Sequence, residues 1–129
     1  MTYIIDVKTK FSPAPAGRLP IHGPDNGQRF RKEILLKALR KHDHVTVDFS
    51  GIATVGASFL NEAIAGLVWH DGFSEEEVRR HLTLTIPSDP SRVETAWAWV
   101  ARAEEKRLEG VRPKGRRGNQ ISSLRHASA

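Results

Sequence analysis

The chain has 129 residues, a length that fits one domain, and its formal net charge is +5 at pH 7. It contains no cysteine, which excludes disulfides and thiolate metal sites and suits a reducing compartment, so we expect a cytoplasmic protein. Asp6 interrupts the first apolar run and no later apolar stretch is long enough to cross a bilayer, so we expect neither a signal peptide nor a membrane anchor.

The first quarter of the chain predicts one strand and a long irregular connection. Residues 2–7 are rich in β-branched and aromatic side chains, which indicates a strand. Residues 9–27 contain four prolines and three glycines, a composition that excludes a helix. Within this connection, residues 18–21 could add a short strand at the edge of the sheet, which is where a strand containing Pro20 is tolerated.

The middle of the chain predicts a helix, a buried strand and a second helix. Asp25 and Asn26 are both good N-caps for the first helix, which should end near Lys41. Residues 45–49 alternate apolar and polar side chains and predict a strand. After Gly56 the apolar residues recur at helical spacing; they are Phe59, Leu60, Ala63, Ile64, Leu67 and Val68.

The last third predicts a short helix, a strand and a long helix. Ser74 and Glu77 have the spacing of a capping box, so a helix should cover residues 75–81. Residues 82–86 alternate as a strand, and residues 91–108 should form a helix that stops at Gly110. Strands joined through helices are usually parallel. We therefore expect a small two-layer α/β sandwich with about four strands, the central ones parallel, and about four helices.

Residues 106–129 differ from the rest of the chain in composition. They contain seven Lys or Arg and one acidic residue, and they are rich in Gly and Ser with few large apolar side chains. Such a segment cannot bury enough surface to fold. We therefore expect a domain over residues 1–105 and a disordered basic tail. A basic tail can attract nucleic acid, although this one has no aromatic residue to stack on bases.

Several short motifs resemble those of the STAS-like domains of unknown function found in bacteria. They are Gly17-Arg18-Leu19, Gly27-Gln28-Arg29-Phe30-Arg31, Val47-Asp48-Phe49-Ser50-Gly51, Ser58-Phe59-Leu60-Asn61-Glu62-Ala63 and Gly66-Leu67. Members of that family typically show a Gly-x-x-Phe-Arg step into the first helix and a Ser-Phe-(Leu)-x-Glu step into the second. The resemblance covers roughly residues 3–105 and implies a STAS-like fold.

A more distant resemblance reaches the STAS domains of anti-sigma factor antagonists, which are switched by phosphorylation of a serine. In those domains a strand ending in Asp-x-Ser-Gly leads to that serine at the start of the next helix. Aligned on Asp48, Ser50 and Gly51, the pattern places Ser58 at the phosphorylated position. The resemblance implies a regulatory protein–protein interaction module in bacterial signalling, with a histidine-kinase-like ATPase as partner. The residues alone also allow Ser58 to act as the N-cap of the helix.

Four residues of the second helix share a stripe that its apolar positions leave free. They are Ser58, Glu62, Ala65 and Trp69, spaced i, i+4, i+7 and i+11. We expect this stripe to face outward and to form the partner-binding surface together with the Ser50-Gly51 turn, with Trp69 as a contact anchor. Alternatively, Trp69 packs under the following loop near Phe73.

Arg29 and Arg31 lie in the first turn of the first helix, where a cation opposes the helix dipole. An internal carboxylate, such as that of Glu62 or Asp48, or an anionic partner should compensate this charge. We predict a structural ion pair that joins Glu62 to Arg29 or Arg18.

No arrangement of side chains in the sequence demands catalysis. Ser-His-Asp, Cys-His and paired-carboxylate patterns are missing, as is the Gly-Lys-Ser/Thr of a P-loop, and His42 and His44 have no third metal ligand at a recognisable spacing. We therefore expect a protein that is not an enzyme and needs no cofactor or metal. Its function is then a protein-binding module of STAS type or, as the alternative, nucleic-acid association through the basic tail, which a salt titration would distinguish.

Overall fold

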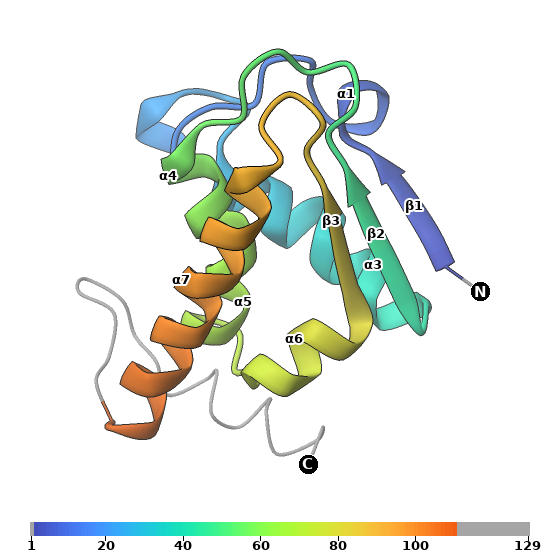
Figure 1. Ribbon diagram of the computed structural model, residues 1–129. Helices are drawn as coiled ribbons and strands as arrows, with labels where there is room; N and C mark the ends of the chain where they lie inside the picture. Colours follow the sequence, from blue (N-terminus) through green and yellow to red (C-terminus); the bar gives the residue numbers. More distant parts are fainter. Residues whose placement is uncertain (1, 111–129) are drawn as a thin grey trace.

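Three alternating segments of the sequence form one parallel sheet. In the computed structural model, which describes residues 2–110, the strands are β1 (Thr2–Asp6), β2 (His44–Asp48) and β3 (Leu82–Thr85). They are ordered β1-β2-β3, and the register pairs Tyr3 with Val45 and Val45 with Leu82. Figure 1 shows the three strands side by side along one edge of the molecule.

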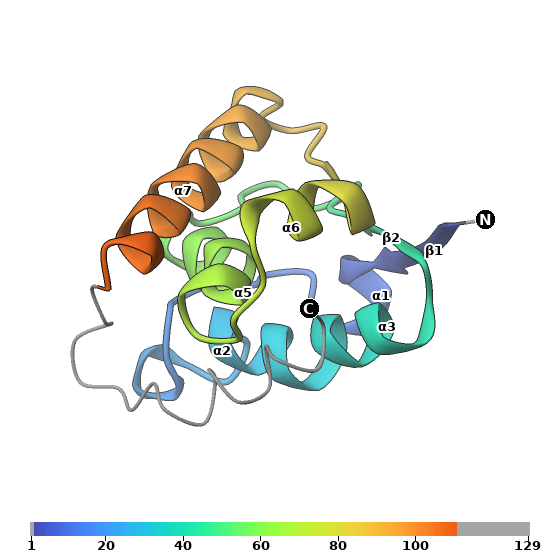
Figure 2. The ribbon, with the colours of Figure 1, turned by 90° about the horizontal axis from the view of Figure 1, so that it is seen from below.

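Among residues 2–110, helices cover one face of this sheet only (Figure 2). Alternate strand residues are buried on that face; they are Ile5, Val45, Val47, Leu82 and Leu84. The intervening residues Thr83 and Thr85 are exposed, and Ile4 is 55% exposed. Because successive strand side chains point to opposite faces, this pattern describes two layers. The predicted α/β sandwich is confirmed.

The first long helix begins and ends as the sequence predicts. It is continuous through α2 (Gly27–Arg29), the π-helical stretch η2 (Phe30–Leu35) and α3 (Leu36–Lys41), and is called helix 27–41 below. Asn26 is the N-cap, since its side-chain oxygen accepts a hydrogen bond of 2.9 Å from the backbone N–H of Arg29.

The second long helix also contains a π-helical stretch. It comprises α4 (Ala57–Leu60), η3 (Asn61–Ala65) and α5 (Gly66–Trp69), and is called helix 57–69. It is followed by α6 (Glu75–His81), β3 and the long helix α7 (Ser91–Leu108). The predicted capping box of α6 is formed, because Ser74 and Glu77 each accept a hydrogen bond from the other's backbone N–H. Helix 57–69 lies between helix 27–41 and α7 (Figure 2).

Phenylalanines fix the two long helices to each other. The ring of Phe59 lies 5.7 Å from that of Phe30 and 6.3 Å from that of Phe49, measured between centroids. Phe11 adds an edge contact to Phe30 at 5.2 Å. Aromatic pairs at these separations attract one another beyond the effect of their burial, so this cluster holds the N-terminal halves of the helices in register.

Two expectations about the chain path need correction. The edge strand over residues 18–21 is not formed: Pro20–His22 is a 3-10 turn, η1, stabilised by a hydrogen bond from the Leu19 N–H to the His22 ring. Val7, expected at the end of β1, starts the short helix α1 (Val7–Lys10). The sheet therefore has three strands among the described residues instead of about four.

The last helix, α7, ends at Leu108 as predicted, so it overlaps the first three residues of the tail set by composition. Residues 106–108, assigned to the tail from composition, form the last turn of α7, and Gly110 follows with a positive φ of 83°. The rest of the predicted tail, residues 111–129, lies outside the described residues. Over residues 2–110, no helix combines the length and the apolar character that a bilayer crossing requires.

Candidate functional site

A buried ionic cluster joins the two long helices. Arg31 is fully buried, and its Nη1 donates hydrogen bonds to the Glu62 carboxylate and, at 3.0 Å, to the Glu62 carbonyl oxygen. Its Nε lies 2.8 Å from Oδ2 of Asp71, just beyond helix 57–69. A charge taken out of water is tolerated only when it is paired and hydrogen-bonded. Arg31 therefore links helix 27–41 to the middle of helix 57–69 through Glu62, and to the segment that follows this helix through Asp71.

Glycines and π-helical turns make room for this cluster. Arg31 lies in η2 and Glu62 lies in η3. A Cβ atom on Gly66 would lie 2.6 Å from Nη1 of Arg31, and one on Gly27 would lie 2.6 Å from the carbonyl oxygen of Phe59. Gly27 is therefore needed for the close approach of the two helix backbones, and Gly66 leaves the space that the Arg31 guanidinium occupies. π-Helical turns occur frequently at functional sites, so this region is a candidate functional site.

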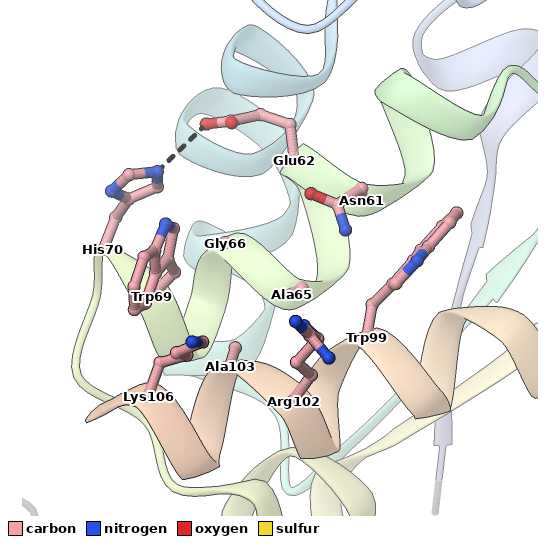
Figure 3. Close-up of a pocket in the computed structure, with 10 residues that line it drawn as sticks. All are labelled: Asn61, Glu62, Ala65, Gly66, Trp69, His70, Trp99, Arg102, Ala103 and Lys106. Atoms are coloured by element: carbon pink, nitrogen blue, oxygen red, sulfur yellow. Dashed lines mark ion pairs between the residues drawn. The ribbon is translucent and has the colours of Figure 1, made fainter. Parts of the chain in front are cut away.

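Further polar side chains surround the Glu62 carboxylate. Arg18 Nη1 lies 3.7 Å from Glu62 Oε1 and donates a 2.9 Å hydrogen bond to the side-chain oxygen of Asn61. The buried His70 ring has its Nε2 3.7 Å from Glu62 Oε2, the pair drawn in Figure 3. The carboxylate is thus held from several directions, which gives this part of helix 57–69 a fixed geometry.

Asp71 gives the cluster a pH dependence. Burial raises the pKa of its carboxyl above the ordinary value of 3.8, and the Arg31 guanidinium, which favours the carboxylate, offsets only part of this effect. The native state therefore binds this proton more tightly than the unfolded state. The resulting stability is complete below pH 3.8 and is lost as the pH rises through the native pKa.

We therefore expect the free energy of unfolding of the wild type, relative to that of Asp71→Asn, to fall as the pH rises from 3.8 through the native pKa, and then to level off. Urea unfolding of the two proteins at a series of pH values measures this difference. A difference that grows with pH would mean that Arg31 outweighs burial and lowers the pKa of Asp71.

A groove with a volume of about 240 Å³ lies between helix 57–69 and α7 (Figure 3). Small residues of the two helices, Ala65, Gly66 and Ala103, line it and let the backbones approach. The half-buried Trp69 and Trp99 stand on either side of these small residues. The other lining residues are polar or charged; they are Asn61, Glu62, His70, Arg102 and Lys106. Apolar walls beside cationic side chains suit recognition of an amphipathic ligand.

Comparison with known proteins identifies the fold family. Residues 26–92, more than half of the chain, match the family described as a STAS-like domain of unknown function. The chain belongs to this family. The matching segment of the STAS-like domain includes Arg31, Glu62, Asp71 and Trp69, whereas the α7 side of the groove lies beyond it. No curated protein and no solved structure shows a significant match to the chain.

The outward stripe expected on the second helix of the STAS-like domain is wrong at two of its four positions. Glu62 is 3% exposed because it faces Arg31, and Ala65 is 5% exposed because it lines the contact with α7. Ser58 is exposed and Trp69 is half-buried. Spacing within one helix shows which positions are apolar. Helix 57–69, however, is packed between two other helices, so its polar stripe is covered as well.

The exposed members of the predicted surface lie at the carboxyl end of the sheet. Ser50 and Gly51 form the turn after β2, in which Asp48 Oδ1 accepts hydrogen bonds from the Ser50 N–H at 3.0 Å and the Ser50 hydroxyl at 2.6 Å. Trp69 lies eleven residues beyond Ser58, roughly 16 Å along a helix axis. The predicted surface is therefore divided into a turn region and a groove region.

Ser58 does not cap its helix. The N-cap is Gly56, and Ser58 is the second residue of α4, exposed and without a side-chain hydrogen bond to any described residue. The interpretation of Ser58 as an N-cap is therefore wrong. Its phosphorylation stays a prediction.

The predicted arginines are divided between two environments. Arg18 lies within ion-pair distance of Glu62, whereas Arg29 pairs at 3.3 Å with both Asp25 and Glu33 on the surface. His42 belongs to no metal-binding group among the described residues. Within residues 2–110, no three or more His, Asp or Glu side chains lie together in a way that could hold a metal ion.

Sequence reasoning missed the centre of the cluster and the second wall of the groove. The sequence predicts that Glu62 or Asp48 compensates the first-turn cations Arg29 and Arg31, but the specific ion pair it predicts joins Glu62 to Arg29 or Arg18. Arg31 precedes the buried Leu35 and Ala38 by four and seven residues and so shares their stripe. That position was a usable signal of burial. The contribution of Trp99 has no such signal, because it depends on which helix α7 covers.

Proposed function

We propose that this STAS-like domain is a non-catalytic regulatory module that binds a protein partner through the groove between helix 57–69 and α7. The observation that supports the proposal is the pair of half-buried tryptophans, Trp69 and Trp99, on one groove. Tryptophan is among the residues most enriched where protein interfaces have their largest binding energies. By analogy with the antagonist STAS domains, the proposed partner is a histidine-kinase-like ATPase in bacterial signalling.

The surroundings of the groove favour binding over turnover. Glu62 and Gly66 line it; Glu62 is held in place by Arg31, whose guanidinium lies directly behind Gly66. A surface that is rigid before association loses little conformational entropy on binding. In this proposal Ser50, Gly51 and Ser58 form a second contact region, where a phosphate on Ser58 would add negative charge and weaken or redirect the contact.

Tryptophan substitutions test the proposal, and the chain offers a matched control. Trp69→Ala and Trp99→Ala should each cost about 2 kcal/mol or more of binding free energy, roughly a 30-fold loss of affinity. Trp97 lies on α7, as Trp99 does, and is also half-buried. The Arg79 guanidinium lies 4.9 Å from the centroid of its ring, and Trp97 does not line the groove. Trp97→Ala should therefore bind almost normally.

The measurement begins with capture of partners from the native host by the wild-type chain and continues with calorimetry on the purified partner. Circular dichroism and thermal unfolding establish that each variant is folded. If Trp69→Ala and Trp99→Ala bind the partner as tightly as Trp97→Ala does, the groove is not the binding surface.

The alternative function is nucleic-acid association through the basic tail. It is favoured by the seven Lys or Arg among residues 106–129. Anisotropy of a labelled DNA duplex at increasing salt distinguishes the two functions. Steep salt dependence that disappears on deletion of residues 111–129 supports the alternative, whereas partner binding that survives this deletion supports the groove.

A further inference from the structure

The groove carries positive charge that no described residue neutralises. Arg102 and Lys106 lie one helical turn apart on α7 and border the same groove. Within residues 2–110, neither has a carboxylate oxygen within 4.0 Å, whereas the neighbouring Arg107 pairs with Glu104 at 2.9 Å. Among the described residues that line the groove, Glu62 alone has a carboxylate, and it is already bound by Arg31 and Arg18.

The size of the groove limits what it can hold. Its volume of about 240 Å³ is below the usual range of small-molecule sites, which begins at about 300 Å³. The space suits one bulky side chain, inserted between Trp69 and Trp99 and over Ala65 and Ala103. A side chain of this kind would come from a polypeptide. Arg102 and Lys106 would then contact the residues on either side of it.

We propose that the groove binds an acidic peptide segment. One bulky apolar side chain of the segment enters between Trp69 and Trp99, and its flanking carboxylates pair with Arg102 and Lys106. The inference rests on the proposed function, because it names the chemistry of the partner. Charges of opposite sign across an interface select the partner and speed association.

Charge also argues against the chain's own tail as the occupant. Residues 111–129 contain five Lys or Arg and no acidic residue. Such a segment would bring like charge beside Arg102 and Lys106, which is unfavourable. The same basic segment would attract an acidic partner from a distance, and this attraction should weaken with salt.

The experiment pans a phage-displayed library of random peptides against the full-length protein. We expect the selected peptides to be enriched in Asp and Glu around a single Leu, Ile, Phe or Trp. A fluorescein-labelled peptide from this selection should bind the Arg102→Glu/Lys106→Glu variant at least about tenfold more weakly than the wild type. The control variant Lys37→Glu/Lys41→Glu has the same charge change at the same spacing on exposed positions outside the groove, and it should bind within about twofold of the wild type.

A second measurement places the peptide on the surface. Peptide binding should shift the indole N–H signals of Trp69 and Trp99 in a ¹⁵N-labelled sample and leave that of Trp97 nearly unchanged. Neutral or basic selected peptides, failure to select any peptide, or equal binding to the charge-reversed variant would overturn the inference. So would larger shifts of these two signals with a single-stranded DNA oligonucleotide than with the peptide.

The inference and the proposed function fail in different ways. If the native partner loses affinity for Trp69→Ala and Trp99→Ala but binds Arg102→Glu/Lys106→Glu normally, the groove is the interface and its partner is not acidic. If all these variants bind the native partner normally, the groove is not the interface and the proposed function fails.

Discussion

Replacing Arg31 with methionine should lower the free energy of unfolding by about 3–5 kcal/mol, the largest loss we expect from a single substitution in this domain. The substitution keeps most of the apolar volume and removes only the guanidinium. It leaves the carboxylates of Glu62 and Asp71 without their shared cation in a buried region. Urea unfolding followed by circular dichroism at neutral pH measures the loss.

Arg29→Met is the matched control for this substitution. Arg29 lies two residues away on the same helix, but it is 40% exposed and pairs with Asp25 and Glu33 at the surface. Exposed ion pairs contribute little, so this variant should lose at most about 1 kcal/mol. Should Arg31→Met not fold at all, Arg31→Lys, which keeps the charge but cannot bond both carboxylates in the same way, should show an intermediate loss. An Arg31→Met protein as stable as Arg29→Met would show that the buried pairing contributes nothing.

Gly27→Ala should also destabilise the domain, by about 1–3 kcal/mol. The direction is informative, because alanine is normally the better helix residue by up to about 1 kcal/mol. Here the added Cβ would lie 2.6 Å from the carbonyl oxygen of Phe59 and 3.0 Å from Cβ of Glu62. A backbone carbonyl cannot rotate away as a side chain can, so the two long helices must separate.

Gly56→Ala separates this packing effect from the general effect of removing a glycine. Gly56 has an ordinary φ of −65°, and a Cβ there would meet no atom within 4 Å. Because Gly56 is the N-cap of α4, where alanine is less favourable than glycine, we expect a small decrease in the thermal midpoint of this variant, against a larger decrease for Gly27→Ala. Equal midpoints for the two variants would mean that helices 27–41 and 57–69 can move apart at no cost.

The substitutions of Arg31 and Gly27 that lower stability also affect helix 57–69, which forms one wall of the groove. Arg31 lies directly behind Gly66, and Glu62 precedes Trp69 by seven residues on the same helix. Loosening the ionic cluster should therefore disturb the position of Trp69 as well as the fold. Binding measurements on the Arg31 variants must for this reason be made well below their unfolding transitions.

Most of the elements and the fold class can be predicted from the sequence, because the signals for them are local. Alternation in residues 45–49 and 82–86, the Asn26 cap and the Ser74–Glu77 capping box each depend on neighbours within a few residues, and each is found in the structure. Helical connections between the strands were enough to predict parallel pairing. The short motifs were enough to predict the STAS-like family.

The use of each helix face depends on contacts between segments far apart in the sequence. Arg31 bonds to Glu62, 31 residues away, and to Asp71, 40 residues away. The groove combines Trp69 with a tryptophan on α7. Periodicity in one helix cannot show which neighbour will cover it, so Glu62 and Ala65 were expected at the surface and are buried. A polar side chain can be buried wherever a distant segment supplies its partner, and that segment is known only once the chain is folded.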